Sequence, residues 1–261
     1  MEILIYLLIF IMGTFFGSFF TLAVYRIPLG QDILYTHSYC PNCKHKLNIL
    51  DLFPVFSYIF LKGKCRYCGN KIRIRYLLLE VLSGIVFLLY AISFKFNFIY
   101  LEVHKLINFV FFILYFVSLF IIAGIDKEKI KIQNSLLIYN FILSIGYIIY
   151  VCTQNLESVY SYGIYLFVML VSTIINSILV HKLKKQNYIV QLIALSSYMI
   201  IFSSIIGFII TLILSIITIF ITYLTKKICK SKMNKISNGF YLCIINVAFI
   251  IFINFIQYYI L

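Results

Sequence analysis

The sequence predicts an all-α polytopic membrane bundle of about eight transmembrane helices, with a small cytoplasmic zinc-binding insert. Three observations lead to this prediction. Apolar residues make up 63% of the 261 residues, charged residues make up only 11%, and four of the seven cysteines fall in one polar stretch. A soluble domain is about half apolar and about a quarter charged. The composition therefore excludes a soluble globule, a disordered chain and a disulfide-stapled secreted domain.

The helices follow from apolar runs of about 17–25 residues, the length that crosses a bilayer. The run from Tyr188 to Leu224 is too long for one crossing, so we divide it near Ser203, Ser204 and Gly207. The predicted spans cover residues 3–25, 77–94, 106–125, 135–152, 159–180, 188–206, 207–225 and 238–260. The predicted domains are a first transmembrane helix (1–25), a four-cysteine loop (26–76) and a seven-helix membrane domain (77–261).

The net charge is +14, and the distribution of its Lys and Arg residues along the chain indicates the membrane topology. With the N-terminus outside, 20 of the 22 Lys and Arg residues fall in the inside segments, and only Lys95 and Lys105 fall outside. Because cytoplasmic loops accumulate Lys and Arg, the N-terminus is predicted outside the plasma (inner) membrane and the 26–76 loop in the cytoplasm. The predicted contacts of this charge are lipid headgroups, and no nucleic-acid partner is predicted.

The polar loop contains two Cys-x-x-Cys pairs, Cys40-Pro-Asn-Cys43 and Cys65-Arg-Tyr-Cys68, separated by 21 residues. This spacing is typical of tetrahedral zinc sites, in which each pair offers two thiolates from one tight turn. Two disulfides would be an alternative, but cytoplasmic thiols stay reduced. His37 and His45 flank the first pair and are less favoured ligands. Four cysteine ligands leave no open position on the ion, so the predicted zinc is structural.

An ordered set of motifs over about 70 residues then resembles a known family. In chain order they are Gly17-Ser18-Phe19, Tyr25-Arg26-Ile27-Pro28, the two cysteine pairs, Asp51-Leu52-Phe53-Pro54, Ile72-Arg73-Ile74-Arg75-Tyr76 and Glu80. These motifs resemble the type IV prepilin leader peptidase/N-methyltransferase family of intramembrane aspartic peptidases. The resemblance implies cleavage of prepilin or pseudopilin leaders at the cytoplasmic membrane face. It also implies methylation of the new N-terminus from S-adenosylmethionine.

The resemblance further implies two catalytic aspartates. Asp126 matches the first, at the end of the third predicted span. The second, in a Gly-x-Gly-Asp motif, aligns over Gln186-Asn187-Tyr188-Ile189, where no acid is present. Two further family elements are degraded: Ile-Pro-Asp reads Ile132-Gln133-Asn134, and Pro-Phe-Gly-Pro reads Ser237-Asn238-Gly239-Phe240.

The partner of Asp126 therefore stays open. Glu80 is one candidate, and Glu128 is a weaker one because two residues along a helix point about 200° apart. Asp126 is also readable as an interfacial charge balanced by Lys127 and Lys129. The first functional hypothesis is a working prepilin peptidase in which Asp126 is catalytic. The alternative is a degenerate paralogue that binds prepilins or assembly proteins, or only methylates them. A transporter is a third reading, without a repeat to support it.

Overall fold

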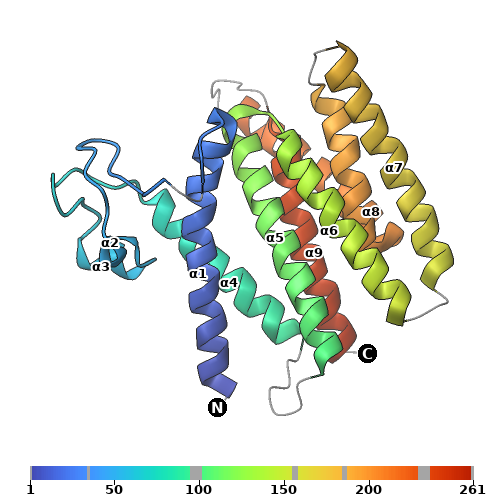
Figure 1. The fold of residues 1–261 in the computed structure, drawn as a ribbon, viewed down its shortest axis with the longest axis horizontal. Helices are drawn as coiled ribbons and strands as arrows, with labels where there is room; N and C mark the ends of the chain where they lie inside the picture. Colours follow the sequence, from blue (N-terminus) through green and yellow to red (C-terminus); the bar gives the residue numbers. More distant parts are fainter. Residues whose placement is uncertain are drawn as a thin grey trace. The chain divides into compact units, whose positions relative to one another are not determined.

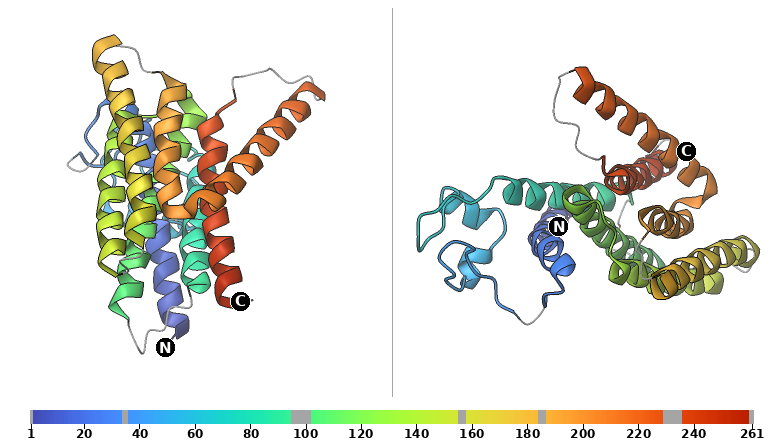
Figure 2. Two further views of the ribbon diagram at one scale, coloured as in Figure 1. Left: turned by 90° about the vertical axis from the view of Figure 1, so that its right-hand side faces the viewer. Right: turned by 90° about the horizontal axis from the view of Figure 1, so that it is seen from above.

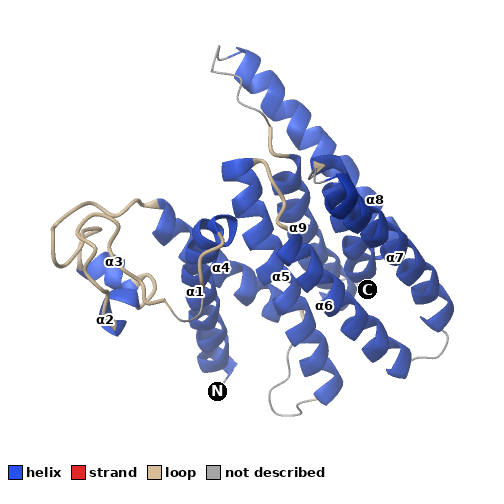
Figure 3. Cartoon of the chain, turned by 45° about the horizontal axis from the view of Figure 1, so that its top comes forward, coloured by secondary structure: helices blue, strands red, loops and turns tan. Residues whose placement is uncertain are grey.

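The computed structural model describes residues 2–33, 36–94, 102–154, 158–183, 187–228 and 236–259. The predictions made for Lys95 and Gln186 lie outside these residues. Within them the chain is helical, and the only β pairing consists of two isolated bridges in the cysteine loop. Figure 3 shows this loop as the longest non-helical stretch of the described chain. The prediction of an all-α fold is confirmed.

The helix bounds agree closely with the predicted spans. Seven of the described helices are long and apolar enough to cross a membrane. In chain order the elements are α1 (Glu2–Arg26), the short 3₁₀ helix η1 (Ile27–Leu29), α2 (Ile49–Leu52), α3 (Phe56–Phe60), α4 (Arg75–Ser93), α5 (Val103–Lys129), α6 (Asn134–Gln154), α7 (Ser158–Leu183), α8 (Tyr188–Ile228) and α9 (Asn238–Tyr259) (Figure 1).

Helix α8 covers the two predicted spans 188–206 and 207–225, which meet at a kink, so the seven candidate spans count these two together. The helix is interrupted at Ser204, whose φ of 64° and ψ of 167° are not helical. The Ser204 hydroxyl accepts a 3.3 Å hydrogen bond from the backbone N–H of Gly207 and so caps the second arm. The predicted division near Ser204 is therefore a sharp bend within one helix, and Figure 2 shows the two arms diverging from it.

The chain forms two compact units, Met1–Leu106 with Asn254–Leu261, and Ile107–Ile253. In the first unit, α1 packs closely on α4. Gly13 and Gly17 lie one helical turn apart on α1, and on α4 Gly84 faces Gly13 while Glu80 faces Gly17. A Cβ atom on Gly13 would lie 2.8 Å from the Cα of Gly84. Small residues at this spacing let two membrane helices approach until their backbones touch.

The second unit has an aromatic core between α5, α6 and α8. The ring of Phe202 stacks on Tyr115 at 4.1 Å and on Tyr147 at 4.8 Å between centroids. The buried Tyr115 hydroxyl donates a 2.9 Å hydrogen bond to Asn246 of α9. Helices α6, α7 and the first arm of α8 pack on one another (Figure 2). This core fixes the ends of α5, α8 and α9 near one another, and the acidic site described next lies at these ends.

Candidate functional site

Asp126 lies at the C-terminal end of α5, and its side chain is completely buried. Its Oδ2 atom accepts two hydrogen bonds, 2.9 Å from the backbone N–H of Phe240 and 3.0 Å from the hydroxyl of Tyr188. Its Oδ1 atom is buried and has no hydrogen-bond partner among the described residues. A buried, half-satisfied carboxylate is costly and is a common mark of a functional group.

The first residues of α8 and α9 supply the contacts around this carboxylate. Tyr188 is the first residue of α8, and its hydroxyl also accepts a 3.1 Å hydrogen bond from the backbone N–H of Gly239, near the start of α9. A Cβ atom on Gly239 would lie 3.0 Å from Oδ2 of Asp126, so a glycine here leaves room for the acid. Lys127 places its ammonium 4.5 Å from the centroid of the Phe240 ring, which adds a second contact between α5 and α9.

The residues around Asp126 come from the family elements that look degraded in the sequence. Tyr188 falls within the stretch aligned with Gly-x-Gly-Asp, and Gly239 falls within the stretch aligned with Pro-Phe-Gly-Pro. Asn134 stands at the second acid of the Ile-Pro-Asp element, and its Oδ1 accepts a 2.9 Å hydrogen bond from Gln191 of α8. The sequence did not single out Tyr188. The signal that could have found it was its place in an aligned catalytic motif.

The two candidate partners of Asp126 have other surroundings. Glu80 belongs to the first unit, where its half-buried carboxylate accepts a 2.8 Å hydrogen bond from the backbone N–H of Val55. Glu128 lies on the same helix as Asp126, and its side chain is exposed. Because both residues lie in α5, two positions apart, their side chains point in different directions, which disfavours their pairing. An Asp126–Glu80 pair remains a prediction.

The four cysteines of the loop form one cluster. The Sγ atoms of Cys40, Cys43, Cys65 and Cys68 all lie within 4.8 Å of one another. The Sγ atoms of Cys40 and Cys68 are 3.9 Å apart, close to the separation of about 3.8 Å that Zn–S bonds of about 2.3 Å give in a tetrahedron. The donor set and its spacing therefore fit a tetrahedral metal ion, as predicted. Neither His37 nor His45 belongs to the cluster among the described residues.

The two cysteine pairs have equivalent backbones, which we call the first knuckle (40–46) and the second knuckle (65–71). The N–H of Cys40 donates to His45 and the N–H of Cys65 to Asn70, at 3.0 and 2.9 Å. One isolated bridge closes each turn, Tyr39 with Lys46 and Lys64 with Lys71. Hydrogen bonding, chiefly from the backbone N–H of Asn70, lowers the pKa of the Cys68 thiol to about 7. Such a thiol yields the thiolate that a metal needs.

Asp51 of α2 connects the knuckles to the rest of the loop. Its carboxylate accepts a 2.6 Å hydrogen bond from Arg66 and one of 3.1 Å from the hydroxyl of Tyr67, both in the second knuckle. Burial raises the pKa of Asp51, but the hydrogen bonds from the Asn48 N–H, Arg66 and Tyr67 outweigh it and hold the pKa below its usual value. The ring of His45 packs on Tyr67 at 3.6 Å between centroids, joining the two knuckles.

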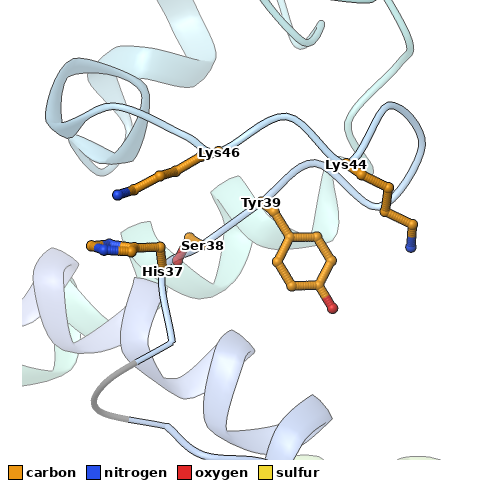
Figure 4. A pocket seen from close by; sticks show the side chains of 5 residues that line it. All are labelled: His37, Ser38, Tyr39, Lys44 and Lys46. Atoms are coloured by element: carbon orange, nitrogen blue, oxygen red, sulfur yellow. The ribbon is translucent and has the colours of Figure 1, made fainter.

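A shallow pocket of about 370 Å³ lies against the first knuckle, lined by His37, Ser38, Tyr39, Lys44 and Lys46 (Figure 4). In Figure 4, His37 and Lys46 extend in one direction and Lys44 in the other. The buried guanidinium of Arg26, at the end of α1, donates hydrogen bonds to the backbone carbonyls of Asp32, Thr36 and His37. Arg26 therefore fixes the start of the loop.

Comparison with known proteins finds relatives for part of this chain. The family described as the bacterial Peptidase A24 N-terminal domain matches residues 11–94. A prepilin leader peptidase/N-methyltransferase of Bacillus subtilis is 35% identical over 133 residues, covering 51% of this chain and 50% of the relative. One of Vibrio cholerae is 31% identical over 153 residues, with coverages of 55% and 57%. One of Myxococcus xanthus is 39% identical over 79 residues, with coverages of 30% and 24%.

The chain thus spans between about a quarter and somewhat more than half of the length of these three relatives. No solved structure shows a significant match. The matched N-terminal domain contains α1 from residue 11 onward, the four-cysteine cluster and α4 with Glu80. Through this domain, the chain is similar to prepilin leader peptidase/N-methyltransferases.

Proposed function

We propose that this protein cleaves the leader of type IV prepilin-like precursors at the membrane face, with Asp126 as the reacting carboxylate. The observation that supports it most is the state of that carboxylate. Oδ2 is held by groups from α8 and α9, whereas the buried Oδ1 is unpaired among the described residues. Because Oδ1 has no hydrogen-bond partner among the described residues, it is suited to accept a proton from a water molecule.

The chemistry can be completed with one carboxylate and one phenol. Ionised Asp126 takes a proton from water as the water attacks the scissile carbonyl, and the same carboxyl group then protonates the leaving amine. The negative charge that develops on the carbonyl oxygen needs a hydrogen-bond donor. The Tyr188 hydroxyl is a side-chain donor next to the reacting carboxylate, since it lies 3.0 Å from Oδ2 of Asp126. In this scheme its single O–H turns from Oδ2 of Asp126 to the carbonyl oxygen and takes over the electrophilic role of the missing second acid.

The proposal includes three finer points. The metal of the four-cysteine cluster is zinc, and it is structural because all four ligands come from the protein. The N-terminus lies outside and the knuckles lie in the cytoplasm, as the distribution of Lys and Arg indicates. Methylation of the trimmed N-terminus from S-adenosylmethionine is the second activity. The names of the relatives support the methylation.

A cleavage assay in liposomes tests the proposal, with an intact family member as positive control. The variants are Asp126→Ala, Asp126→Asn, Tyr188→Phe and the matched control Tyr241→Phe beside the site. We expect wild type and Tyr241→Phe to cleave, both Asp126 variants to be inactive, and Tyr188→Phe to lose about 10²–10³ in kcat. No cleavage by wild type with the control enzyme active would overturn proteolysis. Methyl transfer to a trimmed pilin would then identify a methylating paralogue.

A further inference from the structure

Residues 49–60, which we call the α2–α3 segment, form two short helices inside the cysteine loop. We propose that this segment lies among the lipid acyl chains beside α1, as a short re-entrant element, while the knuckles lie at headgroup level. The proposal concerns where the loop sits and does not depend on the catalytic role of Asp126. Its occupant is lipid, and not a second protein.

The segment exposes an unusual amount of apolar surface. The exposed fraction reaches 84% for Ile49 and 79% for Phe60. The large apolar residues that it exposes are Ile49, Leu50, Leu52, Phe53, Phe56, Ile59 and Phe60. Its single charged residue, Asp51, is turned to Arg66 and Tyr67, and only 4% of its side chain is exposed. An apolar surface of this kind in water is a docking surface or a membrane surface.

The contact between Phe53 and Phe15 places the segment at bilayer depth. Their rings meet edge to face with centroids 5.2 Å apart. Phe15 is near the middle of the first candidate span, Ile3–Leu29. It lies about 16 Å along the axis from Arg26, at 1.5 Å per residue, and the hydrocarbon core is about 30 Å thick. A loop that stayed in water would reach only the end of α1. In Figure 1, α2 and α3 instead lie beside the middle of α1.

A second contact fixes the segment at the same depth. Val55 joins α2 to α3 in a γ-turn of positive φ, with φ 64° and ψ −54°, closed by a 2.6 Å hydrogen bond from the Phe56 N–H to the Pro54 carbonyl. This form of γ-turn is rare and strained. The Val55 N–H points outward and donates to Glu80. A backbone N–H in hydrocarbon must be paired within the protein, and the Glu80 carboxylate supplies that partner.

Glu80 lies five residues after Arg75, the first residue of α4, within the candidate membrane span of that helix. A Cβ atom on Gly17 would come within 2.7 Å of the Cα of Glu80, so the carboxylate starts at the level of Gly17 on α1. The outer faces of α1 and α4 are apolar as well, and Leu8 and Leu82 on them are more than half exposed. Because those faces contact lipid in any membrane-spanning helix pair, lipid is the occupant that also covers the segment.

The absence of tryptophan from the chain makes the test direct. Phe60→Trp gives a single fluorophore on the segment, with Ile49→Trp as a second reporter. Leu8→Trp on α1 is the lipid control, and Tyr39→Trp beside the first knuckle is the aqueous control. Each full-length variant, checked for metal content and a single size, is reconstituted in phosphatidylcholine vesicles with or without dibrominated acyl chains. Quenching by the bromolipid and by aqueous acrylamide is then compared.

We expect bromolipid to quench Phe60→Trp and Ile49→Trp within about twofold of Leu8→Trp. Acrylamide should quench both far less than it quenches Tyr39→Trp. Quenching by acrylamide but not by bromolipid would place the segment in water and overturn the proposal. Protection from both quenchers would mean that protein covers the segment, which would overturn lipid as the occupant.

Discussion

The hydroxyl of Tyr188 donates a 3.0 Å hydrogen bond to Oδ2 of Asp126. The same hydroxyl accepts a 3.1 Å hydrogen bond from the backbone N–H of Gly239, so one phenol joins the ends of three helices. Within the second unit, the acid at this site therefore contacts a weaker acid, whereas the family resemblance implies a dyad of two carboxylates. A phenol donates a hydrogen bond without titrating near neutral pH. The described hydrogen-bond partners of Asp126 are a phenol and a backbone N–H, and neither is a carboxylate.

Gly239→Ala should reduce activity at this site. The added Cβ would lie 3.0 Å from Oδ2 and 3.3 Å from Cγ of Asp126, which is closer than most real Cβ contacts. We expect a loss of at least about tenfold in cleavage and a destabilisation of about 1–3 kcal/mol, because the buried carboxylate has little space to move. The control is Gly163→Ala on α7, where a Cβ would meet nothing within 4 Å. Equal effects of the two substitutions in cleavage and thermal-unfolding assays would contradict the crowding of Asp126.

Substitutions of Glu80 distinguish positioning from catalysis. Glu80→Gln keeps an oxygen that accepts the Val55 N–H, whereas Glu80→Ala leaves that N–H unpaired. If Glu80 positions the α2–α3 segment, Gln should retain most of the cleavage and Ala should cost about 1–3 kcal/mol of stability. The tests are cleavage rate, thermal unfolding, and the bromolipid quenching of Phe60→Trp in each background. Inactivation by Gln at unchanged stability and quenching would instead make Glu80 the catalytic partner that the sequence suggested.

The sequence predicts the helices well because an apolar run of bilayer length must pair its backbone groups within itself, which a helix does. It also locates the four-cysteine cluster, since each Cys-x-x-Cys pair forms a local turn that brings its two thiols together. It fails where the answer depends on tertiary contacts between distant residues. Tyr188 and Gly239 read as remnants of lost motifs, yet both contact Asp126. The division between the two predicted spans near Ser204, in contrast, coincides with the bend between the two arms of α8.

The crossing of α1 and α4 should be intolerant of added side-chain atoms. A Cβ on Gly17 would lie 2.7 Å from the Cα of Glu80 and 2.9 Å from the carbonyl oxygen of Leu79. Both neighbours are backbone atoms, so the helices must separate to admit a methyl group. We expect Gly17→Ala to cost about 1–3 kcal/mol and to lower Tm.

The matched control for Gly17→Ala is Gly146→Ala on α6. Its Cβ would meet only the ring of Phe111, at 3.5 Å and beyond, which is ordinary van der Waals contact. Thermal unfolding in one lipid composition compares the two. A Tm drop for Gly146→Ala as large as that for Gly17→Ala would show that the crossing is not the sensitive feature.

The two knuckles have a left-handed residue at the same position, which is lysine in the first knuckle and glycine in the second. This difference in residue type should set how firmly each knuckle holds metal. Gly69 of the second knuckle has φ 68°, and Lys44 of the first has φ 58°. The left-handed conformation costs a residue with a Cβ about 1–2 kcal/mol, a cost that glycine avoids. Lys44→Gly should therefore slow zinc release to a chromogenic chelator, and Gly69→Lys should speed it, by about 5–30-fold if the whole cost falls on the metal site.

Gly30→Lys is the control for this comparison. Gly30 also has a left-handed φ, 65°, with nothing within 4 Å of a Cβ, but it lies outside both knuckles. Its substitution carries the same backbone strain and should leave the zinc-release rate unchanged. If Gly69→Lys released zinc no faster than Gly30→Lys, the strain would not be transmitted to the thiolates. The metal would then be held by the cysteine spacing alone, without a contribution from the turn.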